Sequence, residues 1–151
     1  PYPNGGELPE EYAHTHDPFV TLAAAAAVTE RLKLGTGICL VTERDPIVLA
    51  KEVASLDLIS GGRFLFGVGS GWNAEEMADH GTDYAVRWDV LRDRVRLMQA
   101  LWENDVASYD GQHAKVSPSW QWPKPVRTPM PVLVGGSSKL SMRHAVEYGT
   151  G

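Results

Sequence analysis

Three short apolar segments alternate with helical segments along this chain, and this alternation constrains its fold more than any other feature. The segments are residues 32–41, 64–68 and 131–134, and each one lies against glycine-rich sequence. Strands that lack a polar alternation are typical of parallel sheets buried on both faces. The pattern therefore predicts an α/β fold with a parallel sheet, either a closed barrel or a doubly wound open sheet.

The expected helices begin and end at recognisable residues. Asp-Pro pairs at 17–18 and 45–46 combine a good N-cap with the residue favoured in the first turn. Gly61 and Gly62 are suited to end the second helix, and Ser137 or Ser138 can cap the last one. Apolar residues at helical spacing predict a further helix near the middle of the chain. The expected helices cover residues 18–31, 46–60, 86–103 and 139–148.

Two other stretches interrupt this alternation. Residues 1–16 show no periodicity and are expected to form a loop. The Asp110-Gly111 pair favours a tight β-hairpin turn, and the loop expected at 117–131 contains five prolines. We therefore predict a hairpin and a proline-rich insertion over residues 105–131.

The chain has too few core strands for a complete barrel or doubly wound sheet. A closed barrel of alternating strands and helices takes about 250 residues, whereas this chain has 151 and three core strands. It begins at Pro1 and stops within what resembles a helix-to-strand connection. We expect residues 1–151 to be a segment of a longer protein, and in the case of a barrel they would form a single partial barrel segment from its middle.

Composition and charge exclude several classes of function. The net charge is -5 and the basic residues are scattered, so nucleic acid is not an expected partner. The longest strongly apolar run, residues 22–28, is far shorter than the about 20 residues of a membrane-spanning helix. The single cysteine, Cys39, lies in an apolar stretch, which favours a core position in a reducing cytoplasm.

The glycine-rich strand ends are the candidate functional positions, because ligands bind at the carboxyl ends of parallel strands. Gly135-Gly136-Ser137-Ser138 leads into a helix, which would expose unpaired N–H groups to a phosphate. A plain strand-to-helix turn with a serine cap fits the same residues. The run from Gly67 to Asn73 departs from the dinucleotide fingerprint, since Trp72 stands where glycine is needed. Small residues needed for packing are the alternative there.

Other reactive side chains give weaker signals. The five histidines and Cys39 have no metal-ligand spacing, so no metal is expected. Ser70 lacks the glycines of a nucleophile elbow. Glu75 and Glu76 follow the second strand, where an acid-base pair is one interpretation, but adjacent carboxylates on a surface turn are expected to be solvated. The default for Trp120 and Trp122 is packing, with cover over a ligand as the alternative.

Together these strand ends resemble those of the luciferase-like monooxygenase superfamily of flavin and deazaflavin enzymes. The resemblance covers nearly all 151 residues and rests on sequence blocks with their spacing. These blocks are Leu34-Gly35-Thr36-Gly37-Ile38, Asp45-Pro46, the run from Ala50 to Asp57, Ser60-Gly61-Gly62-Arg63, Gly67-Val68-Gly69-Ser70-Gly71-Trp72-Asn73, and Pro131-Val132-Leu133-Val134-Gly135-Gly136.

The resemblance implies a (β/α)8 TIM barrel of the luciferase-like type, of which this segment supplies about strands 3–5 with their helices. It implies that a bulge with a non-prolyl cis peptide, mapping to Gly37-Ile38, lies against the cofactor ring. The turn after the next strand would line the ring and its side chain, and the last turn would hold the phosphate. The implied cofactor-binding residues are Gly37, Ile38, Gly69, Ser70, Gly71, Trp72, Asn73, Gly135, Gly136, Ser137 and Ser138.

The Gly71-Trp72-Asn73 sequence is similar to that of the subgroup that uses the deazaflavin F420. The resemblance thus implies an oxidoreductase that transfers hydride to or from a small organic substrate. The alternatives are an FMN-dependent monooxygenase using reduced flavin and oxygen, and a non-catalytic flavin-binding protein. A homodimer and a flavin or F420 reductase partner are also implied. The family's sugar-phosphate dehydrogenases carry glutamate at the position of Trp72, and no catalytic acid or base is assigned within this segment.

Overall fold

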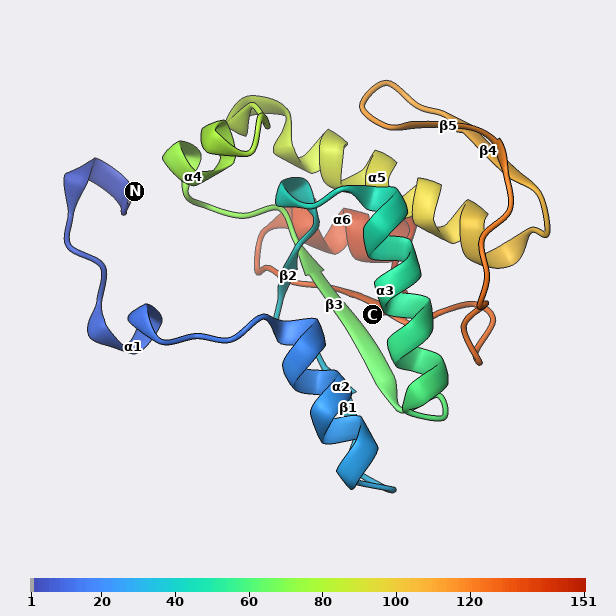
Figure 1. Ribbon diagram of the computed structural model, residues 1–151. Helices are drawn as coiled ribbons and strands as arrows, with labels where there is room; N and C mark the ends of the chain where they lie inside the picture. Colours follow the sequence, from blue (N-terminus) through green and yellow to red (C-terminus); the bar gives the residue numbers. More distant parts are fainter. Residues whose placement is uncertain (1) are drawn as a thin grey trace.

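A parallel sheet forms the centre of the computed structural model, which describes residues 2–151; Pro1, the first residue of the expected loop, lies outside them (Figure 1). Strand β3 (Phe64–Gly69) is the middle strand. Strands β1 (Leu34–Gly35) and β2 (Cys39–Leu40) pair with one edge of β3, and β6 (Val132–Val134) pairs with the other. All pairings are parallel, as the apolar strands predict.

Strands β1 and β2 are two parts of one strand interrupted by a bulge. Gly35 lies opposite Leu65 and Cys39 lies opposite Val68, so four steps along one strand match three along the other. The continuous strand expected over residues 32–41 is therefore corrected, because the extra residue breaks the hydrogen-bond ladder. The cis peptide bond joins Gly37 to Ile38 within this bulge, as the resemblance implies.

Each of the four long helices begins close to its predicted start. Asp17 caps α2 (Pro18–Val28) and Asp45 caps α3 (Pro46–Ile59), each accepting two backbone N–H groups. Ser138 caps α6 (Lys139–Glu147). Helix α5 (Arg87–Glu103) follows a 3-10 turn, η3 (Tyr84–Val86). At the end of α3, Gly61 and Gly62 adopt positive φ angles, which confirms the predicted stop.

The end of α2 at Val28, before the expected Arg31, is explained by Arg63. The Arg63 guanidinium donates to the carbonyl oxygens of Ala26 and Thr29 at 3.0 and 2.8 Å. It also donates to the Leu32 carbonyl at 2.8 Å and to the Thr29 hydroxyl at 3.0 Å. One side chain thus satisfies the carbonyl groups that the end of the helix leaves free.

Replacing Arg63 by Met is expected to lower the free energy of unfolding by about 2 kcal/mol, because charge-assisted hydrogen bonds to part-buried carbonyls are lost. Chemical denaturation followed by circular dichroism measures this change. The matched control is Arg143→Met, an exposed arginine on α6. Equal stability of the two variants would contradict the role assigned to Arg63.

Three short helical segments lie where loops are expected. The expected loop at residues 1–16 contains η1 (Pro3–Gly5) and α1 (Glu10–Ala13). The loop after β3 contains α4 (Ala74–Asp79). Asn73 accepts the N–H of Glu76 and so caps α4, and an Asn three residues before a Glu is a helix-start signal. A further 3-10 turn, η2 (Val41–Glu43), follows β2.

The predicted hairpin is present as β4 (Ala107–Asp110) and β5 (Lys115–Ser119), but its connection is longer than a tight turn. Asp93 on α5 explains the length, since its carboxylate accepts the N–H of His113 at 2.8 Å and the Tyr109 hydroxyl at 3.3 Å. The hairpin is thereby held against α5. The expected loop at 117–131 starts later, because its first residues belong to β5.

The strand and helix order distinguishes a barrel from a doubly wound sheet. The chain end continues the order: the Thr150 N–H donates to the Val132 carbonyl at 2.7 Å, and the Val134 N–H to the Gly151 carbonyl at 2.9 Å. Helices α2, α3, α5 and α6 also contact one another in chain order. A doubly wound sheet reverses its strand order. Here the strands of the sheet and the helices outside it each follow one another in chain order. The chain forms part of a (β/α)8 barrel.

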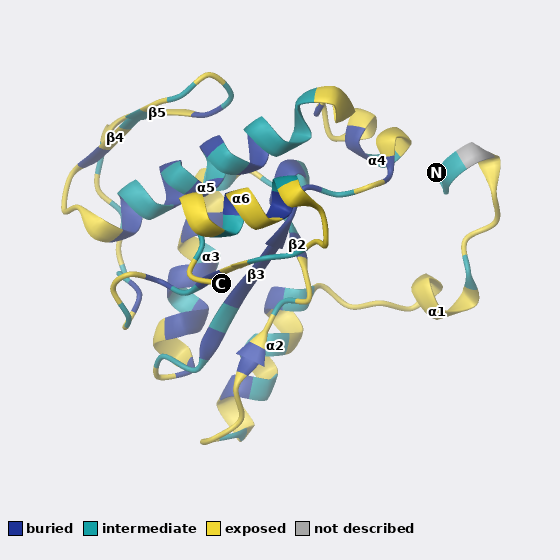
Figure 2. Ribbon diagram, turned by 180° about the vertical axis from the view of Figure 1, so that it is seen from behind, coloured by how far each residue is buried: buried dark blue, intermediate teal, exposed yellow. Residues whose placement is uncertain are grey.

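The core lies between the sheet and the helices, and β3 is dark along most of its length in Figure 2. Phe64, Phe66 and Val68 are fully buried against the helices. The Trp102 indole N–H on α5 donates to the Ala50 carbonyl on α3 at 2.9 Å and joins these helices. Among the described residues, no helix is both long and apolar enough to cross a membrane.

Candidate functional site at the carboxyl ends of the strands

Ile38 brings the three strand ends together. A methyl group built on Gly69 would lie 2.3 Å from Cδ1 of Ile38, and one built on Gly135 would lie 2.9 Å from its Cγ2. The Ile38 side chain therefore crosses the ends of β3 and β6 in contact with both glycine backbones. Larger residues at either glycine would displace Ile38. The predicted residues Ile38, Gly69 and Gly135 thus form one surface, with Ile38 43% exposed on it.

The bulge also depends on Gly67 in the middle of β3. A Cβ at this position would lie 2.0 Å from the Thr36 carbonyl oxygen, so the two backbones approach more closely than a side chain allows. The Thr36 hydroxyl donates to the Gly67 carbonyl at 2.7 Å. These contacts fix where the bulge crosses the sheet and so where Ile38 lies.

The turn between β6 and α6 has the features of a phosphate-binding turn. Gly136 adopts a φ of 134°, which favours glycine, and a Cβ there would lie 2.8 Å from Cβ of Ser141. The Ser138 hydroxyl accepts the Ser141 N–H at 3.1 Å and is committed to capping. In the described part of the chain, the N–H groups of Gly136 and Ser137 have no acceptor. They lie at the positive end of the α6 dipole and are available to an anion.

The stacked rings of Trp88 and His144 pack next to this turn. Trp88 on α5 stacks on His144 of α6 with ring centroids 5.1 Å apart, and Cη2 of Trp88 would lie 3.8 Å from a Cβ at Gly136. His144 is buried, and its Nδ1 atom has no hydrogen-bond partner. Burial lowers the pKa of His144, and the carboxylate of Glu147 partly opposes this effect.

This environment predicts a loss of stability at mildly acidic pH. The unfolded chain takes up a proton at His144 near pH 6.5, whereas the folded chain does so only at lower pH, so stability falls as the pH drops below about 6.5. At pH 5.5 the loss is at most about 1.4 kcal/mol relative to pH 7.5. Denaturation at both pH values, compared with His144→Gln, isolates the contribution. A loss of the same size in the variant would contradict the assignment.

In the run from Gly69 to Asn73, Ser70, Gly71 and Asn73 hold the backbone in place, whereas Trp72 is exposed. Ser70 is buried and its carbonyl accepts the Thr42 hydroxyl at 3.2 Å. Gly71 has a φ of 78°, and a Cβ there would lie 2.6 Å from Cε of Met77. Trp72 is 64% exposed. Asn73 caps α4.

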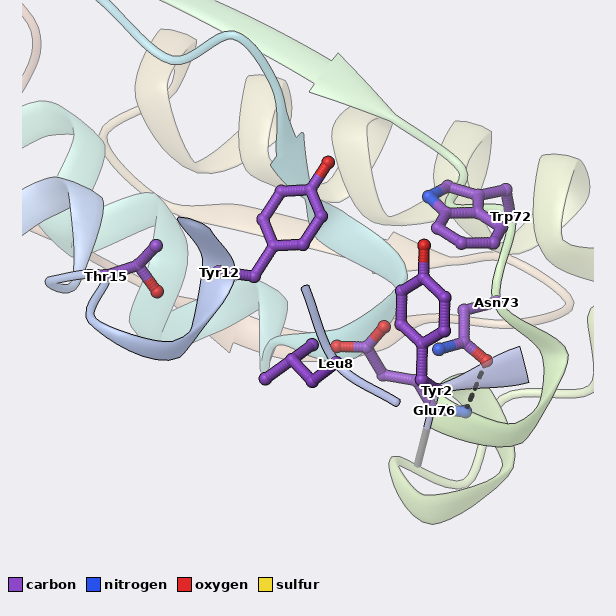
Figure 3. Close-up of a pocket in the computed structure, with 7 residues that line it drawn as sticks. All are labelled: Tyr2, Leu8, Tyr12, Thr15, Trp72, Asn73 and Glu76. Carbon is purple, nitrogen blue, oxygen red and sulfur yellow. Dashed lines mark hydrogen bonds between the residues drawn. The ribbon is translucent and has the colours of Figure 1, made fainter. Parts of the chain in front are cut away.

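Trp72 faces a pocket that the sequence did not reveal (Figure 3). Its volume is about 520 Å³, and the N-terminal segment, residues 2–15, forms one of its walls. The Tyr2 and Trp72 rings meet edge to face with centroids 6.0 Å apart. The N-terminal segment has no periodicity, so sequence patterns could not place it next to Trp72. The pocket is lined by Tyr2, Leu8, Tyr12, Thr15, Trp72, Asn73 and Glu76.

A second pocket of about 600 Å³ shares Thr15 and Glu76 with the first and reaches Ile38. Glu43, Arg44 and His80 supply its other charged or titratable groups. Burial raises the pKa of Glu43, and the carboxylate of Glu76 raises it further. The expectation that Glu76 is merely solvated is corrected: it is half-buried and lines both pockets.

The expectations for Cys39 and for the two tryptophans, Trp120 and Trp122, have clear outcomes. Cys39 is a core residue at 2% exposure, and burial raises the pKa of its thiol to about 12, so it is no nucleophile at neutral pH. Trp120 and Trp122 do not pack as expected, since they are 77% and 53% exposed. Within residues 2–151, no group of three His, Cys, Asp or Glu side chains is arranged to hold a metal ion.

The class of protein is indicated by a partial (β/α)8 barrel with a bulged strand, glycine-rich strand ends, and a turn before α6 whose N–H groups at Gly136 and Ser137 have no acceptor in the described chain. The chain matches the luciferase-like monooxygenase family over residues 7–151. It therefore belongs to that family, and the resemblance seen in the sequence is confirmed.

Two curated relatives are similar to this chain in sequence. An uncharacterised protein of Mycobacterium tuberculosis strain H37Rv is 48% identical over 139 residues, covering 90% of this chain and 49% of the relative. The F420-dependent glucose-6-phosphate dehydrogenase of Nocardia farcinica is 34% identical over 146 residues, covering 90% and 42%. The chain thus spans about half the length, or less, of these curated relatives.

A solved structure agrees with the fold. The oxygenating constituent of 3,6-diketocamphane monooxygenase of Pseudomonas putida, in complex with FMN, gives a TM-score of 0.74 at 25% identity. The match covers 85% of this chain and 39% of that structure. The names of the Nocardia farcinica and Pseudomonas putida proteins both describe an oxidoreductase, with F420 in the first and FMN in the second.

Proposed function

We propose that this chain supplies the cofactor-binding part of an F420-dependent oxidoreductase that transfers hydride to or from a small organic substrate. The observation that carries the proposal is the glycine-lined surface around Ile38 next to an anion-binding turn at α6. The Nocardia farcinica relative supports the choice of F420. The FMN-dependent monooxygenase is the second candidate, supported by the Pseudomonas putida structure.

The residues present fit such a cofactor. Gly136 leaves space that a Cβ would fill, and the N–H groups of Gly136 and Ser137 point to a phosphate-sized anion as their acceptor. Ile38, Gly69 and Gly135 would support a flat ring, because two of these residues have no side chain and the third presents an aliphatic one. When bound, F420 supplies a carbon centre in its ring that donates or accepts hydride.

The chain's own residues would orient the cofactor and exclude water. Thr36 and Gly67 hold the bulge in place, which fixes the height of Ile38 above the sheet. Trp72 lies on the solvent side of the strand ends, where it would cover the edge of a bound ring. Glu43 keeps its proton to a higher pH than an ordinary carboxyl group because it is partly buried next to Glu76.

Turnover by the full protein tests the proposal. The protein is incubated without oxygen with F420 and a panel of alcohols, or with reduced F420 and the matching ketones and aldehydes, and the change in deazaflavin absorbance is followed. Hydride transfer supports the proposal. Oxygen consumption with reduced FMN and oxygenated products would support the monooxygenase instead. Tight cofactor binding without any turnover would favour a flavin-binding protein.

The proposed partners follow from the same assignment. A homodimer is proposed, and light scattering of the full protein tests it through the molar mass. For the FMN alternative a reductase partner would be needed, and a reductase that restores activity from oxidised FMN would identify it. A cytoplasmic location is proposed as well, and fractionation of cells would test it.

A further inference from the structure

Aromatic side chains form part of the wall of the pocket next to Trp72. Three of its lining residues, Tyr2, Tyr12 and Trp72, present rings, and Leu8 adds an aliphatic side chain (Figure 3). Tyr12 and Trp72 are 55% and 64% exposed, so their ring faces are open to a ligand. Binding pockets of several hundred Å³ with aromatic walls and a few polar groups are typical of sites for small organic molecules.

The charges around this pocket disfavour anions. Of the described residues that line it, Glu76 alone carries a charged side chain. The adjoining pocket adds the Glu43 carboxylate, and the positive charge of Arg44 there is already neutralised. Arg44 lies 2.8 Å from the Asp17 carboxylate and 3.8 Å from that of Glu52. Among the described residues that line these pockets, an anionic substrate would therefore meet the carboxylates of Glu43 and Glu76, an arginine that is already paired, and the imidazole of His80.

The two pockets connect the aromatic walls with the proposed cofactor surface. They share Thr15 and Glu76, and the second pocket is lined by Ile38, Cys39 and Leu40 of the bulged strand. Ile38 also contacts Gly69 and Gly135. A molecule seated against Trp72 and Tyr12 would thus lie on the same side of the sheet as a ring supported by Ile38.

We propose that this pocket binds the substrate and selects an uncharged or cationic ring compound, aromatic or alicyclic, over an anion such as a sugar phosphate. The proposal rests on the oxidoreductase function proposed above. It separates this chain from the glucose-6-phosphate dehydrogenase of Nocardia farcinica in substrate while keeping a common cofactor. The N-terminal segment, residues 2–15, is then a specificity element, because it supplies Tyr2, Leu8 and Tyr12.

The test compares three probes of one shape on the full protein. Benzyl alcohol, benzylamine and benzoate share a phenyl ring and have similar sizes, but they are neutral, cationic and anionic. Glucose 6-phosphate serves as the sugar phosphate, and Kd values come from ligand-observed NMR titration without cofactor. Benzyl alcohol is expected to bind at least about tenfold more tightly than benzoate. Tyr12→Ala is expected to weaken it about fivefold or more. Trp120→Ala, an exposed tryptophan outside the pocket, is the matched control and keeps the wild-type Kd.

Glu76→Gln separates charge selection from a structural role. The variant is expected to raise the affinity for benzoate relative to benzyl alcohol, since one repelling carboxylate is removed. Tighter binding of benzoate or glucose 6-phosphate by the wild-type protein would overturn the proposal, as would the failure of all ring probes or no effect of Tyr12→Ala. A parallel titration with F420 and FMN keeps the outcomes apart. Cofactor binding without probe selectivity refutes the substrate class alone, and absent cofactor binding refutes the proposed function.

Discussion

Replacing Ser137 by Glu is expected to weaken cofactor binding about thirtyfold, or by ~2 kcal/mol. Ser137 is exposed in the turn before α6, and its side chain has no hydrogen-bond partner within the described chain. A carboxylate at this position would occupy the positive end of the helix dipole and repel the phosphate. The change leaves Gly136 and the Ser138 cap in place, so the fold should be unaffected.

Ser137→Gln is the matched control, since glutamine has nearly the same size without the charge. It is expected to change the Kd less than about threefold. Fluorescence titration gives both Kd values, and circular dichroism checks that both variants are folded. An equal loss of cofactor affinity in the two variants would mean that side-chain size rather than charge matters. Unchanged affinity in both would contradict the assignment of the phosphate to this turn.

Replacing Asp57 by Ala is expected to lower the free energy of unfolding by about 3 kcal/mol, near the lower end for a broken buried ion pair. Asp57 on α3 is fully buried. Its carboxylate accepts the Val126 N–H at 2.8 Å and lies 3.1 Å from the Arg127 guanidinium. The substitution leaves both donors without this acceptor and releases the proline-rich segment from α3. Arg127 is partly exposed, which limits the cost of its unpaired charge.

A double-mutant cycle isolates the pair from the backbone contacts. Arg127→Met is expected to cost less than Asp57→Ala, because Asp57 retains its backbone donors at Val126. The double variant should be more stable than the sum of the single changes predicts. Chemical denaturation measures all four proteins. Strictly additive changes, or a cost below about 1 kcal/mol for Asp57→Ala, would contradict the assigned role.

The elements that local sequence signals define could be predicted. Asp17, Asp45 and Ser138 cap helices because their side chains satisfy nearby N–H groups, which depends on neighbouring residues alone. The end of α2 depends instead on Arg63, which is more than thirty residues away in sequence. The length of the hairpin connection depends on Asp93, again a distant partner. Such tertiary contacts leave no local pattern.

The candidate site shows the same division. The glycine-rich turns could be placed from motifs and the bulge from the family resemblance, whereas the residue pattern alone predicts a continuous strand. The structure adds the contact of Ile38 with Gly69 and Gly135. The pocket around Trp72 could not, because Tyr2 and Tyr12 come from a segment without periodicity. Asn73 with Glu76 did carry a helix-start signal for α4. That signal would have placed Glu76 on a short helix beside the strand ends.

Titration of the full protein with F420 and, separately, with FMN tests the central claim most directly. The claim is that the surface around Ile38 and the turn at Gly136 and Ser137 bind a deazaflavin. The account predicts micromolar or tighter binding of F420, FMN weaker by at least about tenfold, and loss of F420 binding in Ser137→Glu. Selective binding of FMN would contradict the deazaflavin assignment, and binding of neither cofactor would contradict the site itself.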